Sequence, residues 1–308
     1  MERIIPHVTN ETARLRAVVL GLPDSLGPIP TLQETYDAKS YEAVSRGVFP
    51  SEADVRHEMQ CVLDVLDRYD VRTLRPAQLT DYNQVFARDV AFTIDDTLFI
   101  SNLIPDRERE TEAFASSIFP LIDPAHIESL PEAVHTEGGD VLLYDDILFV
   151  GAYFGDDYSS FKTARTNSYA IDFFRERFPH KRVVPIELRK HDREPAKSVL
   201  HLDCAFQPVS RGRALIYREG FLHERDVALV EEIFGRDNLF GVTPEEAYYM
   251  STNVVSLSPD ALISDRHFTR LNAHLREAWG MTVEEVPYQE ISKMGGLLRC
   301  STMPLIRD

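Results

Sequence analysis

The chain has 308 residues, of which 44% are hydrophobic and 27% are charged, proportions typical of a globular protein. Its net charge of -17 argues against a nucleic-acid partner, because phosphate binding needs a basic surface. No apolar run approaches the length of a membrane span, and the first residues lack the apolar region of a secretory signal. We therefore expect no membrane partner and a cytoplasmic location.

Short β-type runs alternate with helical patterns along the chain. A strand is predicted at 15–20, and apolar spacing predicts an amphipathic helix over 52–69. Four hairpins follow, with strand pairs at 90–94 and 98–100, 141–144 and 147–150, 204–209 and 214–217, and 254–257 and 261–264. Helices are predicted at 107–118, 166–178, 224–234 and 268–279, each followed by another β-like stretch, such as 182–186 or 282–286.

The repeating unit is therefore strand, turn, strand, helix, strand. No low-complexity segment or linker rich in Pro, Gly and Ser divides the chain. These features favour an α/β fold in which residues 1–308 form a single domain of stacked modules.

Chemically matched residues recur near the start of the first strand of successive units. They are Asp89, Glu137, His201 with Asp203, Asn253 and Cys300. Their spacing of roughly 50 to 65 residues is in the range of structural repeats. The simplest interpretation is one functional position per repeat, with Asn253 satisfying backbone groups at a turn.

The three cysteines are too few for a disulfide framework, so at least one thiol is expected to be free. Cys61 lies inside a predicted helix and is expected to pack in the core. Cys300 follows Gly295 and Gly296, which permit close backbone approach. By itself Cys300 fits a small core residue as well as a nucleophile.

The stretch from His201 to Cys204 is expected to be extended. Alternation would then place His201 and Asp203 on one face, as a base beside a carboxylate, and Leu202 and Cys204 on the other face, toward the core. The Glu137-Gly138-Gly139-Asp140 segment predicts a tight turn in which carboxylates face a ligand. Taken singly, a packed histidine or a solvated turn explains these residues equally well.

The chain resembles the guanidino-modifying enzymes of the pentein fold, which include arginine deiminases, dimethylarginine dimethylaminohydrolases, agmatine deiminases and amidinotransferases. The matching motifs, in the order of the family, are Phe86-Ala87-Arg88-Asp89, Glu137-Gly138-Gly139-Asp140, Arg165-Thr166-Asn167, His201-Leu202-Asp203 and Gly295-Gly296-Leu297-Leu298-Arg299-Cys300-Ser301-Thr302. The resemblance covers nearly the whole chain. It implies a five-bladed α/β propeller with pseudo-fivefold repeats of a ββαβ-type module, forming a single catalytic domain.

The same resemblance implies roles for individual residues. Cys300 looks like the nucleophile and His201 like the general acid and base. Asp89, Glu137 and Asp203 look like the carboxylates that hold a guanidinium or orient the histidine. Neither a metal nor an organic cofactor is implied.

Two arginines are rival candidates for binding a substrate carboxylate. Arg165 resembles such an anchor in the amino-acid deiminases, although an apparent insertion at 153–160 separates it from Glu137. Arg299 adjoins the nucleophile.

The expected function is hydrolysis of the guanidinium group of arginine or an arginine-like small molecule, through a covalent thiouronium on cysteine. An amidinotransferase, which passes the amidino group to an amine acceptor, is the alternative, and a non-catalytic pentein binding protein is a third. A metallohydrolase of the arginase type would need clustered Asp and His ligands, which His201-Leu202-Asp203 does not supply. A homodimer is compatible with these expectations.

Overall fold

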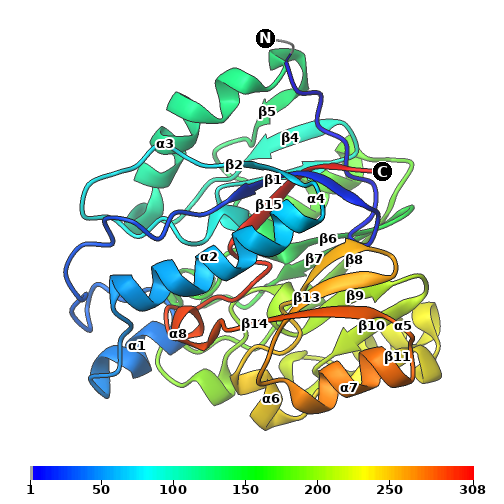
Figure 1. Ribbon diagram of the computed structural model, residues 1–308. Coiled ribbons are helices and arrows are strands. Elements are labelled where there is room, and N and C mark those ends of the chain that lie inside the picture. Colours follow the sequence, from blue (N-terminus) through cyan, green and yellow to red (C-terminus); the bar gives the residue numbers. More distant parts are fainter. Residues whose placement is uncertain (1–2) are drawn as a thin grey trace.

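The computed structural model describes residues 3–308 and contains five three-stranded sheets (Figure 1). In each sheet the first two strands pair antiparallel and the second and third pair parallel. Four of the sheets are β3 (Ala91–Ile94), β4 (Thr97–Ile100) and β5 (Ile127–Ser129); β6 (Val141–Tyr144), β7 (Ile147–Ala152) and β8 (Arg182–Glu187); β9 (Phe206–Ser210), β10 (Arg213–Ile216) and β11 (Leu239–Gly241); and β12 (Val255–Ser258), β13 (Ala261–Asp265) and β14 (Thr282–Val286).

The fifth sheet joins the two ends of the chain. It consists of β15 (Thr302–Arg307), β1 (Leu15–Leu20) and β2 (Arg72–Leu74), with β1 in the middle. Figure 1 shows β1 in blue beside β15 in red, and Val19 pairs with Met303. The strand that follows Cys300 is therefore the first strand of a module whose other two strands lie near the N-terminus.

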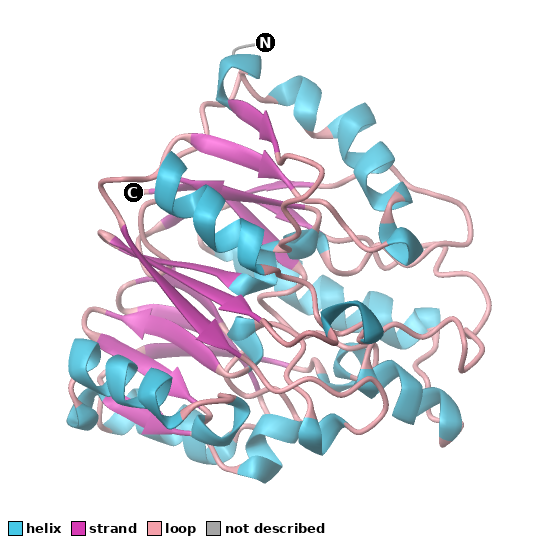
Figure 2. Ribbon diagram, turned by 180° about the vertical axis from the view of Figure 1, so that it is seen from behind, coloured by secondary structure: helices cyan, strands magenta, loops and turns pink. Residues whose placement is uncertain are grey.

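One main helix precedes the third strand of each sheet. These helices are α2 (Glu52–Arg68), α3 (Arg109–Ser117), α4 (Ser168–Arg177), α5 (Glu224–Phe234) and α7 (Thr269–Glu277). Figure 2 shows helices around the outside of the strands. The predicted ββαβ module is confirmed in all five copies, whereas the short helices α1 (Ala38–Ser45), α6 (Pro244–Tyr248) and α8 (Gln289–Ser292) were not predicted.

Local sequence explains these elements. Ser51 caps α2 by accepting a hydrogen bond from the amide of Asp54, and the apolar stripe of the helix buries Met59 and Val62. Two hairpins turn at Asp95 and Asp145, which have φ values of 53° and 52°. Aspartate tolerates this left-handed conformation better than most residues do.

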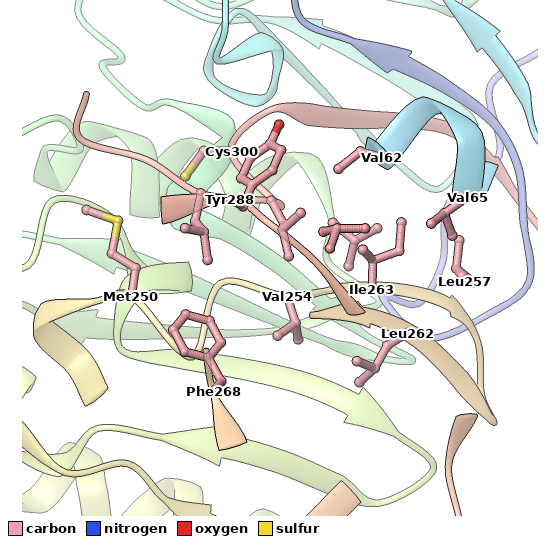
Figure 3. Close-up of a cluster of buried hydrophobic side chains, with 14 of the residues drawn as sticks. Val62, Val65, Met250, Val254, Leu257, Leu262, Ile263, Phe268, Tyr288 and Cys300 are labelled. Atoms are coloured by element: carbon pink, nitrogen blue, oxygen red, sulfur yellow. The ribbon is translucent and has the colours of Figure 1, made fainter. Parts of the chain in front are cut away.

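Buried apolar side chains form several clusters between the modules. The largest includes Val62 and Leu262, and Cys61 packs against it as predicted. Figure 3 shows Cys300 beside Tyr288 in this cluster. Within residues 3–308, no helix combines the length and apolar character needed to cross a membrane.

Candidate functional site

The residues singled out by the sequence lie where the chain enters the first strand of each module. Short 3-10 turns at Ala87–Asp89, Gly138–Asp140 and Leu202–Cys204 precede β3, β6 and β9. Asn253 and Cys300 come just before β12 and β15. Since these positions are equivalent in the repeat, their side chains converge although they are distant in sequence.

Glu137 and His201 form the centre of this group. His201 Nε2 lies 2.9 Å from Glu137 Oε2, and both side chains are almost completely buried. A Cβ atom on Gly139 would lie only 2.6 Å from the His201 ring, so glycine is needed for this close approach. Asp140 accepts a hydrogen bond from the amide of Leu202 at 2.9 Å and thereby fixes the histidine turn.

Asp89 faces the other nitrogen of the same imidazole. Asp89 Oδ1 and His201 Nδ1 are 3.6 Å apart, and neither atom has a hydrogen-bond partner within the described residues. Asp89 Oδ2 accepts a hydrogen bond from Arg107 Nη1 at 2.6 Å. The site therefore contains a buried carboxylate oxygen that is available for a ligand.

Asp203 lies between the nucleophile candidate and a buried arginine. Its Oδ2 is 2.9 Å from Arg299 Nη1 and 3.8 Å from Cys300 Sγ. Arg299 also binds Glu11 through two nitrogens, at 2.9 and 3.2 Å, and donates to the carbonyl of Val141. Because its guanidinium is enclosed by these partners, Arg299 holds Asp203 in place.

Asn253 contacts Cys300 through both ends of its side-chain amide. Its Oδ1 accepts hydrogen bonds from the backbone amides of Arg299 and Cys300, and its Nδ2 lies 3.3 Å from Cys300 Sγ. Satisfying backbone groups was expected, but the contact with the sulfur was not. The sequence placed Asn253 at the repeat position of the site but gave it only a backbone role, so its contact with the sulfur is a finding of the structure.

The prediction of an extended stretch from His201 to Cys204 is wrong. Leu202–Cys204 form a 3-10 turn, so strand alternation does not apply. Cys204 is buried among apolar residues, as expected, but its sulfur also lies 3.5 Å from Asp203 Oδ1. The sulfurs of Cys204 and Cys300 and a carboxylate oxygen of Asp203 all lie within 4.8 Å of one another.

The pKa shifts of His201, Cys300 and Cys204 differ in direction and cause. Burial opposes the charged imidazole, but Asp89, Cys300 and Glu137 outweigh it and hold the pKa of His201 well above its ordinary value. Proximity of the Cys204 thiol lowers the pKa of Cys300; burial and Asp203 oppose this effect, and His201 adds to it. The same thiol contact and burial raise the pKa of Cys204. Cys300 is therefore favoured as the thiolate.

Comparison with known proteins places this geometry in a family. No family model matches the sequence. The uncharacterized protein YkgA of Bacillus subtilis is 33% identical over 224 residues, covering 73% of this chain and 70% of YkgA. An arginine deiminase of Borreliella afzelii is 23% identical, over 73% of this chain and 61% of the deiminase.

Solved structures show the same fold. An amidinotransferase of saxitoxin biosynthesis from Microseira wollei superposes with a TM-score of 0.75 at 14% identity, over 98% of this chain and 97% of the other. The N-terminal domain of a cyanobacterial arginine dihydrolase gives 0.76 at 19% identity, over 94% and 97%. The chain belongs to the family of YkgA and shares the pentein fold of these solved enzymes.

Two further arginines line the site of this pentein protein. Arg165 donates to both oxygens of Glu137, at 3.0 and 2.7 Å, despite the apparent insertion before it. Arg107 donates to Asp89 and Glu110 and lies 3.8 Å from Glu137 Oε2. Sequence analysis missed Arg107, because it lies at the start of a predicted helix in a run of charged residues.

Two groups of side chains have the donor types of a metal site: Asp89 with Glu137 and His201, and Asp203 with Cys204 and Cys300. The three carboxylates are bound by Arg107, Arg165 and Arg299 respectively. These permanent positive charges disfavour a metal cation at the same oxygens. The arrangement suits guanidinium groups better than a metal ion.

Two cavities adjoin the site of this pentein protein. One of about 70 Å³ is lined by Cys204, Lys39, Tyr248 and Gly295. A larger one of about 560 Å³ shares Lys39 and Tyr248 with it, and the Lys39 ammonium lies 3.5 Å from the centre of the Tyr248 ring. The smaller cavity gives small molecules access to Cys204, whereas Cys300 lines neither cavity.

Proposed function

We propose that this chain is a hydrolase that cleaves a C–N bond in the guanidinium group of arginine or an arginine-like compound, through a thiouronium on Cys300. The observation that carries the proposal is the buried Asp89 Oδ1, which accepts no hydrogen bond within residues 3–308 and lies 3.6 Å from His201 Nδ1. A guanidinium is planar and rich in N–H donors, so it can satisfy such an acceptor.

The chemistry of the surrounding carboxylates supports a guanidinium ligand. Asp89, Glu137 and Asp203 each bind a guanidinium group of the chain itself at 2.6 to 2.9 Å. A substrate guanidinium offers the same charge and the same donors. It can donate a hydrogen bond to Asp89 Oδ1 and compete with Arg107 for Asp89 Oδ2.

In the first step, Cys300 Sγ attacks the guanidinium carbon and forms a C–S bond. The lowered pKa of Cys300 favours the thiolate that this step requires. His201, whose raised pKa keeps a proton available, donates that proton to the departing nitrogen as the C–N bond breaks. The amine leaves, and a thiouronium remains on the sulfur.

In the second step, His201 is the base. It takes a proton from water, the oxygen attacks the thiouronium carbon, and the C–S bond breaks while the remaining hydroxyl proton passes to the released amine or to solvent. A ureido product leaves and the Cys300 thiolate is restored. A solved structure of the arginine dihydrolase domain, 18% identical to this chain over 94% of its length, is covalently bound to a reaction intermediate, which supports a covalent route.

We assign the binding of a substrate carboxylate to Arg165 rather than to Arg299. Both guanidinium groups are buried, but Arg299 is bound by two carboxylates, Glu11 and Asp203, and therefore positions Asp203, whereas Arg165 is bound by one carboxylate, Glu137. Arg165 and Arg107 adjoin the guanidinium-binding carboxylates and have Tyr36 in common, with both guanidinium carbons 5.8 Å from the centre of its ring. A substrate guanidinium that displaces Arg165 and Arg107 from these carboxylates would leave both arginines free to bind the substrate carboxylate.

Hydrolysis is favoured over amidino transfer because Asp89 is an acid, as in the deiminases that this chain resembles. Transfer to an amine acceptor remains the second candidate, since amidinotransferases share the fold. We also propose that residues 1–308 form one catalytic domain, because β1 and β15 belong to one sheet.

The test is incubation with arginine, dimethylarginine and agmatine, with and without an amine acceptor. A ureido product formed without acceptor supports the hydrolase. Turnover that depends on the acceptor overturns it in favour of transfer. Activity should persist with a chelator and disappear in Cys300→Ser, while Cys61→Ser is the matched control with unchanged activity.

A further inference from the structure

Cys204 has a position that the proposed reaction does not use. It follows Asp203 directly, and its sulfur lies 3.5 Å from Asp203 Oδ1, the oxygen that is 4.0 Å from Cys300 Sγ. The sulfurs of Cys204 and Cys300 are at most 4.8 Å apart, and both residues are buried. One carboxylate thus contacts two free thiols.

The two thiols differ in chemical character. Contact with Cys204 favours the thiolate of Cys300, whereas the pKa of Cys204 is raised by Cys300, by burial and by Asp203. Cys300 is therefore the thiol that reacts first with an electrophile, because the thiolate is the reactive form. Cys204 remains a neutral thiol next to it.

The two cysteines also differ in their exposure to a cavity, and here Cys204 is the more accessible residue. Cys204 lines the cavity of about 70 Å³, and Cys300 does not. A small oxidant of the size of hydrogen peroxide that enters this cavity arrives at Cys204, at most 4.8 Å from the sulfur of Cys300. The third cysteine, Cys61, lies on α2 and packs against the largest apolar cluster, as a half-buried residue outside the site.

We propose that Cys204 and Cys300 form a reversible disulfide when a peroxide oxidises Cys300, so that Cys204 is a modification site that protects the nucleophile. The inference rests on the proposed function only in taking Cys300 as the nucleophile. Formation of the disulfide itself requires no turnover of substrate.

The chemistry balances in two steps. The Cys300 thiolate attacks one oxygen of the peroxide, the O–O bond breaks, and sulfenic acid and hydroxide form. The Cys204 thiol then attacks the sulfenic sulfur and loses its proton, and the hydroxyl group leaves as water. The two sulfurs together lose two electrons, which reduce the peroxide. A thiol reductant reverses the result.

Formation of this bond requires a local adjustment. A disulfide has a sulfur separation of about 2.05 Å, so the two sulfurs must move together from a distance of at most 4.8 Å. Bringing the sulfurs together changes their present contacts with Asp203 and Asn253. The disulfide form should therefore be inactive, both because the nucleophile is consumed and because the site is disturbed.

The experiment treats the unaltered protein with a several-fold molar excess of hydrogen peroxide, enough for two-step oxidation of a thiol, and maps disulfides by non-reducing peptide mass spectrometry. We expect a peptide pair joined through Cys204 and Cys300, which disappears on treatment with dithiothreitol. Thiol alkylation at Cys300 should be blocked and then restored in parallel. Absence of this peptide pair, or a pair joined through Cys61, would overturn the proposal.

Variants test the protective role. In Cys204→Ser the same treatment should drive Cys300 to sulfinic acid, which dithiothreitol does not reverse, so recovery of alkylation falls at least several-fold. Cys61→Ser should behave as the unaltered protein. Equal recovery in Cys204→Ser would refute protection. Because mapping and alkylation need no substrate, a failed guanidine assay leaves this test intact and refutes only the proposed reaction.

Discussion

Asn253 donates its side-chain N–H toward Cys300 Sγ at 3.3 Å while its carbonyl oxygen accepts the Cys300 backbone N–H at 3.2 Å. The same oxygen accepts the amide of Arg299 at 2.8 Å. One buried amide therefore fixes the backbone before β15 and supplies a donor to the sulfur. It couples the fourth module to the nucleophile of the fifth.

Replacing this donor should slow the reaction of the thiol. Asn253→Ala removes a hydrogen bond to a charged sulfur, worth about 1.5 to 3 kcal/mol, so kcat/KM should fall roughly 10- to 100-fold. Asn253→Asp should instead raise the pKa of Cys300 by placing a carboxylate beside it. The rate of alkylation by iodoacetamide as a function of pH measures this shift.

A matched control for these variants is Asn238→Ala. Asn238 donates to the carbonyl of Phe234 at 2.8 Å, at the end of α5 and outside the site. It should leave the alkylation profile unchanged. An unchanged profile in Asn253→Asp as well would show that the amide does not influence the sulfur.

The titration of Cys300 should depend on His201. The charged imidazole contributes to the lowered pKa of the thiol, so His201→Gln should shift the pH dependence of alkylation upward. In the unaltered protein, the raised pKa of His201 keeps it charged while the thiolate forms. The measurement is iodoacetamide alkylation of Cys300 between pH 5 and 10. Coincident curves for the two proteins would contradict an ion pair at this site.

Glu137 should stabilise the fold as well as the site. Burial raises the pKa of Glu137, but Arg165 and His201 outweigh it, so the pKa is lowered in the folded state. The stability that the Glu137 carboxylate contributes is then fully present above its ordinary pKa of about 4.5. This stability is lost as pH falls through the lowered pKa. Glu137→Gln should reduce the free energy of unfolding by about 3 kcal/mol at pH 7, because it leaves Arg165 buried without its carboxylate.

Urea unfolding at several pH values tests this expectation. The difference between the unaltered protein and Glu137→Gln should shrink as pH falls below about 4.5. Glu58→Gln is the comparison, because burial raises the pKa of Glu58 and its carboxylate accepts backbone amides rather than an arginine. For Glu58→Gln, the difference in unfolding free energy from the unaltered protein should not shrink as pH falls. A difference for Glu137→Gln that is independent of pH would refute the linkage.

Arg299 should act through structure rather than substrate binding. Glu11, whose pKa is about 2 because Arg299 and Arg88 outweigh the effect of burial, is its second carboxylate partner. A double-mutant cycle of Arg299→Gln and Glu11→Gln should therefore give a coupling energy of about 1 to 3 kcal/mol in urea unfolding.

By contrast, Arg165→Gln should raise KM more for arginine than for agmatine, which lacks the carboxylate. A selective KM effect in Arg299→Gln instead would reverse the two roles.

Local patterns predicted the modules well. The apolar spacing of α2 and the aspartate turns at Asp95 and Asp145 are properties of short segments, so they are readable without the fold. The 3-10 turn at Leu202–Cys204 was missed because its His-Leu-Asp-Cys sequence is also compatible with a strand. Tertiary contacts, including the hydrogen bond that the Leu202 amide donates to Asp140, select the turn.

The sequence by itself determined the repeating ββαβ unit and the family, because periodicity and ordered motifs are written along the chain. It also supplied Cys300, His201 and the three acids as candidates. Only the tertiary structure decided which side chains meet. It brought Asn253 and Cys204 to the nucleophile, since equivalent positions in different modules converge at distances that sequence separation does not encode. It also enclosed Arg299 among Glu11 and Asp203, because burial of that charge requires partners from distant segments.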